Sequence, residues 1–345
     1  MSQCKRYTAV NINSSSLSLL RCLADGCFHS GESLGHTLGV SRAAIWKILQ
    51  GFSSLGVEVE RQKGRGYRIV GGLSLLDEKE IRAYIGNPLV DELGSIVIAP
   101  VIDSTNRYLL DNLQGADGSG RGSACLAEMQ EAGRGRRGRV WVSPFARNIY
   151  MSVSWQFEQG IAALEGLSLA VGVAIVQSLA GLGFSGVQLK WPNDILVDNK
   201  KLGGVLLEIA GDVSGQCYVV VGVGINVDMP GDLQEVISQP WLDLARLACV
   251  SGVKLPSRSH LAGALLAEML QVLRTYESLG FEHYRSRWQE LSAHAGQTVA
   301  LITASKEVRG VMMGVSSSGA LRLEVDGVER QFVGGEISLR YSQKS

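Results

Sequence analysis

The stretch from Gln130 to Trp141 constrains the fold more than any other part of the sequence. After a predicted strand it places glycines at 133, 135 and 138, a formal Gly-x-Gly-x-x-Gly spacing, with four arginines interleaved. A dinucleotide-binding fold needs a helix directly after these glycines, because the helix N-terminus holds the pyrophosphate. The residues that follow, Val-Trp-Val-Ser-Pro, cannot open a helix. We therefore exclude a Rossmann fold and interpret the segment as a loop whose arginines bind phosphate or carboxylate.

The pattern of the central part predicts an α+β fold with a mixed sheet. A length of 345 residues predicts two or three domains, and 46% hydrophobic with 19% charged residues is typical of a folded globular chain. Between 77 and 290, predicted strands mostly follow predicted strands, which is not the order of a regular βαβ array. The predicted strands are 96–101, 124–129, 149–157, 187–197, 205–209 and 218–227, and the predicted helices are 104–113, 161–182 and 257–279. The polar segment 228–240, with two prolines, is expected to be a mobile loop.

The first 71 residues show the pattern of a winged helix. An apolar stripe at helical spacing over 16–25 is followed by a short glycine-closed helix over 30–39 and a second helix that starts after Ser41. Two helices joined by a tight turn predict a helix-turn-helix, and the strands 57–60 and 67–70 flank a basic turn that contains Lys63 and Arg65. Because the whole chain has 33 basic and 33 acidic residues, DNA binding must come from this local basic face. The alternative is a small helical docking domain whose charges face water. The predicted DNA contacts are Ser41, Arg42, Trp46, Lys47, Lys63 and Arg65.

The last part of the chain predicts a small β-barrel. Only short strands are expected after residue 296, at 298–302, 308–315, 320–325 and 336–340. With Gly71-Gly72 as the first boundary, the predicted domains are 1–71, 77–290 and 296–345.

The cysteines and the longest uncharged segment bound the cellular setting. The six cysteines form no Cys-x-x-Cys pair and the five histidines no His-Glu-x-x-His, so we expect reduced thiols and no structural metal. The N-terminus shows no export signal, which favours a cytoplasmic protein. No charge occurs between Glu165 and Lys190, a length that could span a membrane. Several polar residues interrupt it, so a buried helix is expected instead.

Polar and cationic residues recur where apolar strands end or turn. The motifs are Lys-Trp-Pro-Asn-Asp at 190–194, Lys-Leu-Gly-Gly at 201–204 and Gly-Val-Gly-Ile-Asn at 222–226. Such positions carry function on a rigid sheet, although a buried Lys or Asn can also satisfy backbone groups. Taken alone, the segment 133–139, here called the Gly-Arg loop, is equally compatible with an unstructured basic loop or a nucleic-acid contact. The four features together favour an anion-binding active site.

In this order the motifs are highly specific, and the chain resembles the bifunctional biotin–protein ligases, also called biotin operon repressors, over nearly its whole length. The resemblance implies a winged helix, a central class II synthetase-like ligase domain and an SH3-like C-terminal barrel. It implies that biotin and MgATP form biotinyl-5′-AMP, with ATP, Mg²⁺ and biotin as substrates and no bound prosthetic group. The biotinyl group then passes to a lysine of the biotin carboxyl carrier protein. It also implies operator DNA and a ligand-promoted homodimer as partners, and no membrane.

The resemblance also assigns site residues, by motif match. Biotin is assigned to Ser104, Thr105, Asn106, Gln130, Arg134, Gly135, Arg136 and Lys201. ATP and the adenylate are assigned to Trp141, Lys190, Asn193, Asp194, Asn226 and Arg340. Independently, 103–106 looks like a helix N-cap that could present hydroxyl and N–H groups to a small polar ligand, or simply cap the helix. A carboxylate that attacks the α-phosphate is already anionic and needs no strong base, so Arg136, Lys190 and Lys201 are predicted to be catalytic by stabilising charge.

Two departures and two alternatives accompany this interpretation. Trp46 and Ile48 stand where the best-known member has polar residues, and Val140 stands where a lysine is common. The DNA target and one loop contact are therefore open. One alternative is a pure transcription factor that only senses biotin, but such a sensor need not retain phosphate-handling cations. The other is a related cofactor ligase, such as one for lipoate, against which the Gly-Arg loop and the winged helix argue.

Overall fold

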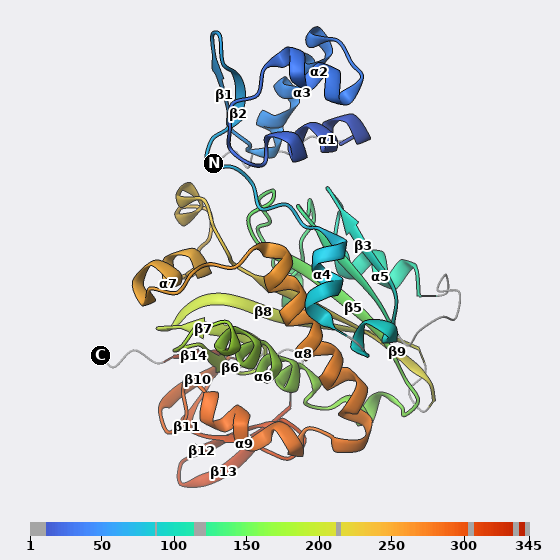
Figure 1. Cartoon of the computed structure of the whole chain (residues 1–345). Helices are drawn as coiled ribbons and strands as arrows, with labels where there is room; N and C mark the ends of the chain where they lie inside the picture. Colours follow the sequence, from blue (N-terminus) through green and yellow to red (C-terminus); the bar gives the residue numbers. More distant parts are fainter. Residues whose placement is uncertain are drawn as a thin grey trace.

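The computed structural model describes residues 12–86, 88–113, 122–211, 215–302, 307–333 and 338–341, without side-chain detail for the last of these ranges. Figure 1 shows three parts along the chain: a helical N-terminal part, a central sheet with helices, and a C-terminal sheet at the opposite end.

The N-terminal part is a winged helix, as predicted. The side chains of Asn13, Ser30 and Ser41 each accept a hydrogen bond from a backbone N–H in the first turn of the helix that follows. Gly39, in the left-handed region at φ 67°, ends the second helix and makes the turn of the helix-turn-helix. The elements are α1 Ser14–Leu23, α2 Gly31–Leu38, α3 Arg42–Gly51, the 3₁₀ turn η1 Phe52–Leu55 and the hairpin strands β1 Val59–Gln62 and β2 Gly66–Ile69.

The hairpin is attached to the loop between α1 and α2. The backbones of His29 and Tyr67 exchange two hydrogen bonds of 2.9 Å. Gly66 has φ 109°, and a Cβ atom there would lie 1.9 Å from the carbonyl oxygen of His29. Only glycine permits this close approach, which fixes where the wing leaves the domain.

A buried ion pair attaches the connection after the winged helix to the central part. Arg258 and Glu128 form an ion pair and are only 2% and 3% exposed. The free Glu128 oxygen accepts from the backbone N–H of Leu76 at 2.7 Å, and Arg258 donates to the carbonyl oxygen of Ser74 at 2.9 Å. Since every polar group of the pair is hydrogen-bonded to the protein, burial of the charges is compensated. The neighbouring Met129 packs into the hydrophobic core of the winged helix.

The central part is built on a mixed seven-stranded sheet, which confirms the predicted fold class. The strand order is β3-β4-β5-β9-β8-β7-β6, in which β3 and β4 are parallel and the other pairs antiparallel. The strands are β3 Leu93–Ala99, β4 Gly122–Ala127, β5 Ile149–Phe157, β6 Gln188–Lys190, β7 Asp194–Val197, β8 Lys200–Gly211 and β9 Cys217–Ile225.

Helices cover both faces of this sheet. Successive strand residues point to opposite faces. Accordingly Val219 and Val221 belong to the main core with α6 and α8, while Val220 packs with Leu109 of α5. The helices are α4 Glu78–Ile85, α5 Thr105–Asp111, α6 Leu167–Gly181, α7 Leu244–Ser251, α8 Arg258–Leu279 and α9 Glu282–Leu291, with 3₁₀ turns η2 Leu89–Glu92, η3 Arg136–Gly138, η4 Ile161–Leu164 and η5 Gly231–Gln234.

Among the described residues, one segment, Ile161–Gly181, is long and apolar enough to cross a membrane by length and composition. It contains α6, which packs on α8, α9 and the sheet, and 61% of its most apolar window is buried. These contacts are those of the core helix that the sequence predicted.

The C-terminal part is a five-stranded antiparallel sheet of order β13-β12-β11-β10-β14. Its strands are β10 Thr298–Ile302, β11 Glu307–Val315, β12 Leu321–Val325, β13 Val328–Phe332 and β14 Ser338–Tyr341. The indole N–H of Trp191 donates to the carbonyl oxygen of Gly319 at 3.0 Å. This contact joins the C-terminal sheet to the turn between β6 and β7.

The structure corrects several predicted elements. The single strand expected at 187–197 is wrong: a turn at Trp191, Pro192 and Asn193 divides it into β6 and β7. Four elements had no clear sequence signal, namely α4, α7, α9 and β13. The segment 228–240 is a loop, as predicted, with the short turn η5 inside it.

Candidate active site

One half of the site is a hydrogen-bonded chain between α5 and the sheet. Gln130 Oε1 accepts from the backbone N–H of Thr105 at 2.9 Å and lies 3.2 Å from Thr105 Oγ1. The Thr105 hydroxyl lies 2.7 Å from the hydroxyl of Ser152 on β5, which in turn donates to Asn106 Oδ1 at 2.5 Å. Thr105, Asn106 and Ser152 are buried, so this chain is fixed before any ligand binds.

The chain continues to the Gly-Arg loop through Glu208 on β8. The Asn106 amide donates to Glu208 Oε2 at 2.8 Å, and Arg134 approaches both carboxylate oxygens, at 3.1 and 3.2 Å. Asn106 fits here because position 222 is a glycine: a Cβ there would lie 2.1 Å from Asn106 Oδ1. The network therefore runs from Gln130 through α5 and two strands and returns to the loop at Arg134.

The other half is a cluster of cations around the β6–β7 turn. Lys201 Nζ lies 2.7 Å from Asp194 Oδ1, and Lys190 Nζ lies 3.9 Å from Asp194 Oδ2. Arg136 of the Gly-Arg loop donates to Asn193 Oδ1 at 3.4 Å. Among the described residues, Arg136, Lys190 and Lys201 gather around the β6–β7 turn, and converging cations suit an anion such as a phosphate group.

Burial increases the tendency of this cluster to take an anion. Burial lowers the pKa of Arg136 from its ordinary value and neighbouring Arg137 lowers it further, while Asp194 acts in the opposite direction. His294, which lies near Lys190, has a pKa lowered to about 4, chiefly by burial and then by the Lys190 charge. A cation kept from water beside other cations gains more from a bound anion than an exposed one does.

Trp141 lies between the cation cluster and β9. The Lys201 ammonium is 5.4 Å from the centre of its ring, and the buried indole N–H has no hydrogen-bond partner among the described residues. The ring packs directly against β9 because position 224 is a glycine, where a Cβ would come within 2.6 Å of the ring. An aromatic ring with an unused donor beside a cation cluster is suited to a planar polar group such as a nucleotide base.

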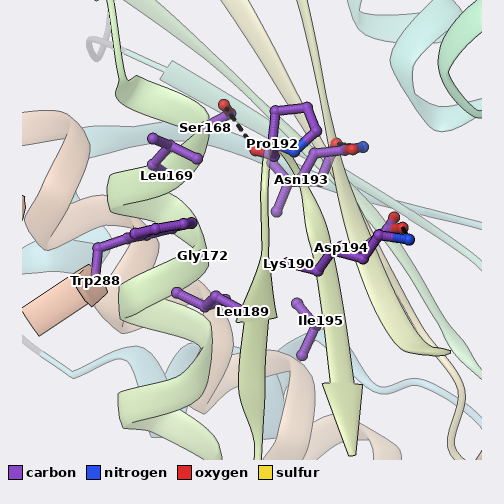
Figure 2. Close-up of a pocket in the computed structure, with 11 residues that line it drawn as sticks. Ser168, Leu169, Gly172, Leu189, Lys190, Pro192, Asn193, Asp194, Ile195 and Trp288 are labelled. Atoms are coloured by element: carbon purple, nitrogen blue, oxygen red, sulfur yellow. Dashed lines mark hydrogen bonds and ion pairs between the residues drawn. The ribbon is translucent and has the colours of Figure 1, made fainter. Parts of the chain in front are cut away.

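A small hollow lies beside the cation cluster, between α6 and the strands β6 and β7. Figure 2 shows Leu169, Leu189 and Trp288 on its apolar side, next to α6. The Lys190 and Asp194 side chains lie together on the side of the hairpin away from α6. The hairpin thus has an apolar face in the core and a polar face in the site.

Not every predicted site residue joins these groups. The Asn226 amide donates to the carbonyl oxygens of Lys201 and Leu242, at 3.3 and 3.1 Å, so it attaches a loop to β8. Ser104 is buried at the N-cap of α5 without a side-chain capping bond, and the Gly135 N–H donates to Arg139 O at 2.7 Å. The backbone of Arg340 pairs with Ala300 on β10, and its side chain lies outside the described part, as do residues 334–337.

The Gly-Arg loop confirms the exclusion of a Rossmann fold. Only the three-residue turn η3 follows its first two glycines, and no helix begins before residue 144. Within the described ranges there is no group of three or more His, Cys, Asp and Glu side chains that could hold a metal ion.

The predicted DNA contacts gather on the winged helix. Ser41 caps α3, and Arg42, Trp46 and Lys47 are exposed on that helix, with Trp46 50% exposed. At the wing, the Arg65 guanidinium lies 4.2 Å from the ring centre of Phe28, and Lys63 is exposed beside it. The helix α3, which is the recognition helix, and the basic turn between β1 and β2, which is the wing, are thus both exposed and can face a duplex.

Sequence reasoning missed Ser152 and Glu208. Ser152 is one of three polar residues that alternate along β5, with Ser154 and Gln156, and Glu208 interrupts the apolar run of β8. Both are weak signals. Their contacts join residues 46 and 102 positions apart, which no local pattern reveals.

The mixed sheet, with its Gly-Arg loop and cationic strand ends, defines the class of biotin and lipoate ligases, here joined to a winged helix. The Biotin/lipoate A/B protein ligase family matches residues 98–226, an HTH domain matches 16–68, and the biotin protein ligase C-terminal domain matches 294–340. The chain belongs to the biotin protein ligase family, among its bifunctional ligase/repressor members.

Individual relatives agree with this assignment. The bifunctional ligase/repressor BirA of Escherichia coli K12 is 42% identical over 332 residues, which cover 96% of this chain and 99% of the relative. A biotin–[acetyl-CoA-carboxylase] ligase of Mycobacterium tuberculosis is 34% identical over 65% of this chain and 81% of its own length. The biotin protein ligase of Aquifex aeolicus, solved with biotin and ATP, is 25% identical with a TM-score of 0.59, over 72% of this chain and 99% of that chain.

Proposed function

We propose that this chain is a biotin–protein ligase and a biotin-responsive transcriptional repressor. In the first step, a biotin carboxylate oxygen forms a bond to the α-phosphorus of MgATP, and the bond to pyrophosphate breaks. In the second, the ε-amine of a carrier-protein lysine attacks the acyl carbon and AMP leaves. The observation that carries the proposal is the juxtaposition of a hydrogen-bonding half and a cationic half in one site.

Each half of the site is assigned to one substrate. We assign the ring of biotin to the half that contains Ser104, Thr105, Asn106, Gln130, Arg134 and Gly135. We assign the nucleotide to Trp141, Lys190, Asn193, Asp194 and Arg340, with Asn226 as support for the loop beside Lys201. The divalent cation of MgATP, as part of the substrate, would take oxygen ligands, which Asp194 and Asn193 offer.

Catalysis is electrostatic in this proposal. Lys201, Arg136 and Lys190 hold charge on the phosphoryl oxygens and the departing pyrophosphate, and none of them transfers a proton. Lys201 lies among the residues assigned to the nucleotide, because it contacts Asp194 and lies near Trp141. Closure of the Gly-Arg loop would also keep water from the reactive anhydride.

The acceptor and the competing substrate can be tested together. Purified protein is incubated with biotin, MgATP and a carrier-protein fragment, and the fragment is examined by mass spectrometry for one added biotinyl group. Lipoate in excess should leave the yield unchanged. Addition of a lipoyl group instead would assign the chain to lipoate.

The repressor function rests on the exposed recognition helix and the basic wing. We infer that the adenylate promotes a homodimer, which places two winged helices on a palindromic operator in the cytoplasm. Operator affinity in a gel-shift assay should rise when biotinyl-AMP is present. Equal affinity with and without it would contradict ligand-linked repression. We propose domain limits of 1–71, 77–290 and 296–345, with the connection 72–76 attached to the central part by the hydrogen bonds of Ser74 and Leu76.

A further inference from the structure

Glu208 is the carboxylate of the biotin half of the site. Its side chain is 26% exposed on β8, and it accepts from Asn106 on α5 and from Arg134 of the Gly-Arg loop. An ionised carboxylate only accepts hydrogen bonds, whereas an amide and a hydroxyl can each donate and accept. Glu208 is therefore the member of the chain that can set the direction of every other bond.

The donor and acceptor of each hydrogen bond follow in turn from Glu208. Asn106 must turn its NH₂ to Glu208, so its carbonyl oxygen faces Ser152 at 2.5 Å. Ser152 has one proton and must donate it to that oxygen. The 2.7 Å contact between Ser152 and Thr105 then requires Thr105 to be the donor.

The proton of Thr105 is thereby committed to Ser152. Its longer contact, 3.2 Å to Gln130 Oε1, is the weaker one, and that oxygen already accepts the backbone N–H of Thr105. The Thr105 hydroxyl therefore offers a ligand a lone pair and not a proton. A cyclic urea presents two N–H donors beside one carbonyl, so an acceptor at this position fits its N–H edge.

We propose that Glu208 is a positioning residue that fixes Thr105 as a hydrogen-bond acceptor for an N–H of the biotin ureido ring. This inference rests on the proposed function, because Thr105 is placed at that ring only there. Glu208 itself touches no substrate in this account. It acts through Asn106 and Ser152, over a chain of three hydrogen bonds.

The test is Glu208→Gln, which keeps shape but lets the side chain donate to Asn106 and so reverse the chain. In biotin-dependent exchange of pyrophosphate into ATP, the KM for biotin should rise about tenfold, the size of one lost hydrogen bond. The KM for ATP and the kcat at saturating biotin should stay within about twofold. Asp111→Asn, which removes an exposed carboxylate from the same helix α5, is the matched control and should leave the KM for biotin unchanged.

The double variant E208Q/N106D separates direction from simple contact. It exchanges the amide and the carboxylate, so position 208 donates, position 106 accepts from both neighbours, and Thr105 is again an acceptor. The KM for biotin should return to within about threefold of the wild-type value. If Glu208 acts by holding Arg134, the exchange restores nothing, because the carboxylate has left position 208.

Three results would overturn the inference: an unchanged KM for biotin in E208Q, an equal rise in the KM for ATP, or no recovery in the double variant. If E208Q does not fold, the double variant alone decides, since near-normal biotin affinity with the two groups exchanged supports the direction argument and a weak one contradicts it. Failure of the proposed function looks different, because the wild-type protein itself would then show no biotin-dependent exchange.

Discussion

The ammonium of Lys201 lies 2.7 Å from the carboxylate of Asp194, across the antiparallel pair β7 and β8. Both side chains are mostly buried, with 16% and 18% exposed. Two rigid strands therefore hold the lysine in position before any substrate arrives, and little reorganisation is needed when charge develops beside it.

Lys201→Ala should slow adenylate formation by about 10²–10³-fold, the effect typical of losing one preorganised donor. Pre-steady-state measurement of biotinyl-AMP formation gives this rate directly. The neighbouring Lys200→Ala, which removes an exposed lysine from the same strand, should retain the wild-type rate. Adenylate formation at full speed in K201A would refute the role of Lys201.

Two glycines on β9 should affect different substrates. Gly224→Ala places a methyl group against the Trp141 ring, so the KM for ATP should rise by roughly ten- to a hundredfold. Gly222→Ala displaces Asn106, so the KM for biotin should rise instead. Gly181→Ala, at a helical position with open space, is the control. Equal effects of the two β9 variants on both substrates would contradict the division of the site into halves.

Loss of either basic residue at the wing tip should weaken DNA binding without changing sequence preference. Lys63→Ala and Arg65→Ala each remove a phosphate contact, so the slope of log affinity against log salt should fall by about 1 for each. Fluorescence anisotropy with operator and scrambled duplexes measures both effects. Lys79→Ala, an exposed lysine of α4, should change neither, and unchanged slopes in the wing variants would exclude the wing from the interface.

The stability of the protein should decrease as acid protonates His294. Its folded pKa of about 4 lies below its unfolded value of 6.5, so the unfolded state binds the proton more strongly between these pH values. The contribution of the neutral histidine is fully present above about pH 6.5 and is lost as the pH falls towards 4. At about pH 5 it should have decreased by about 2 kcal/mol.

Urea unfolding at about pH 7 and about pH 5 tests this, because His294→Gln should lose less stability over the interval than the wild type. His283→Gln, at an exposed position of α9, should behave as the wild type. The same pH dependence in H294Q and in the wild type would show that His294 does not titrate as its burial implies.

Local patterns were sufficient to predict the parts of the fold with strong periodicity. The winged helix, β5 and α8 were predicted because apolar spacing, capping residues and glycine turns agree there. The helix α9 had no such signal, since Trp288 is its one buried residue and most of the others are polar or charged. The strand β13 is short and almost wholly exposed, so its apolar alternation is absent.

The site was predictable in its motifs but not in its connections. The Gly-Arg loop and the three strand-end motifs are each a continuous stretch of sequence and can therefore be recognised locally. The structure brings Arg136, Lys201 and Asp194 to one place. The network through Ser152 and Glu208 depends on strand register, which pairs Ser152 with Gly222 and leaves room for Asn106 above it. Register is a tertiary property, so the sequence offered no measure of it.

Isotope exchange shows whether this site activates the carboxylate of biotin with ATP. Labelled pyrophosphate is added to the protein with MgATP, with and without biotin, and ATP is recovered. Label should appear in ATP when biotin is present, and no carrier protein should be required. Folded protein that exchanges no more label with biotin than without it would contradict the activation of biotin by ATP at this site.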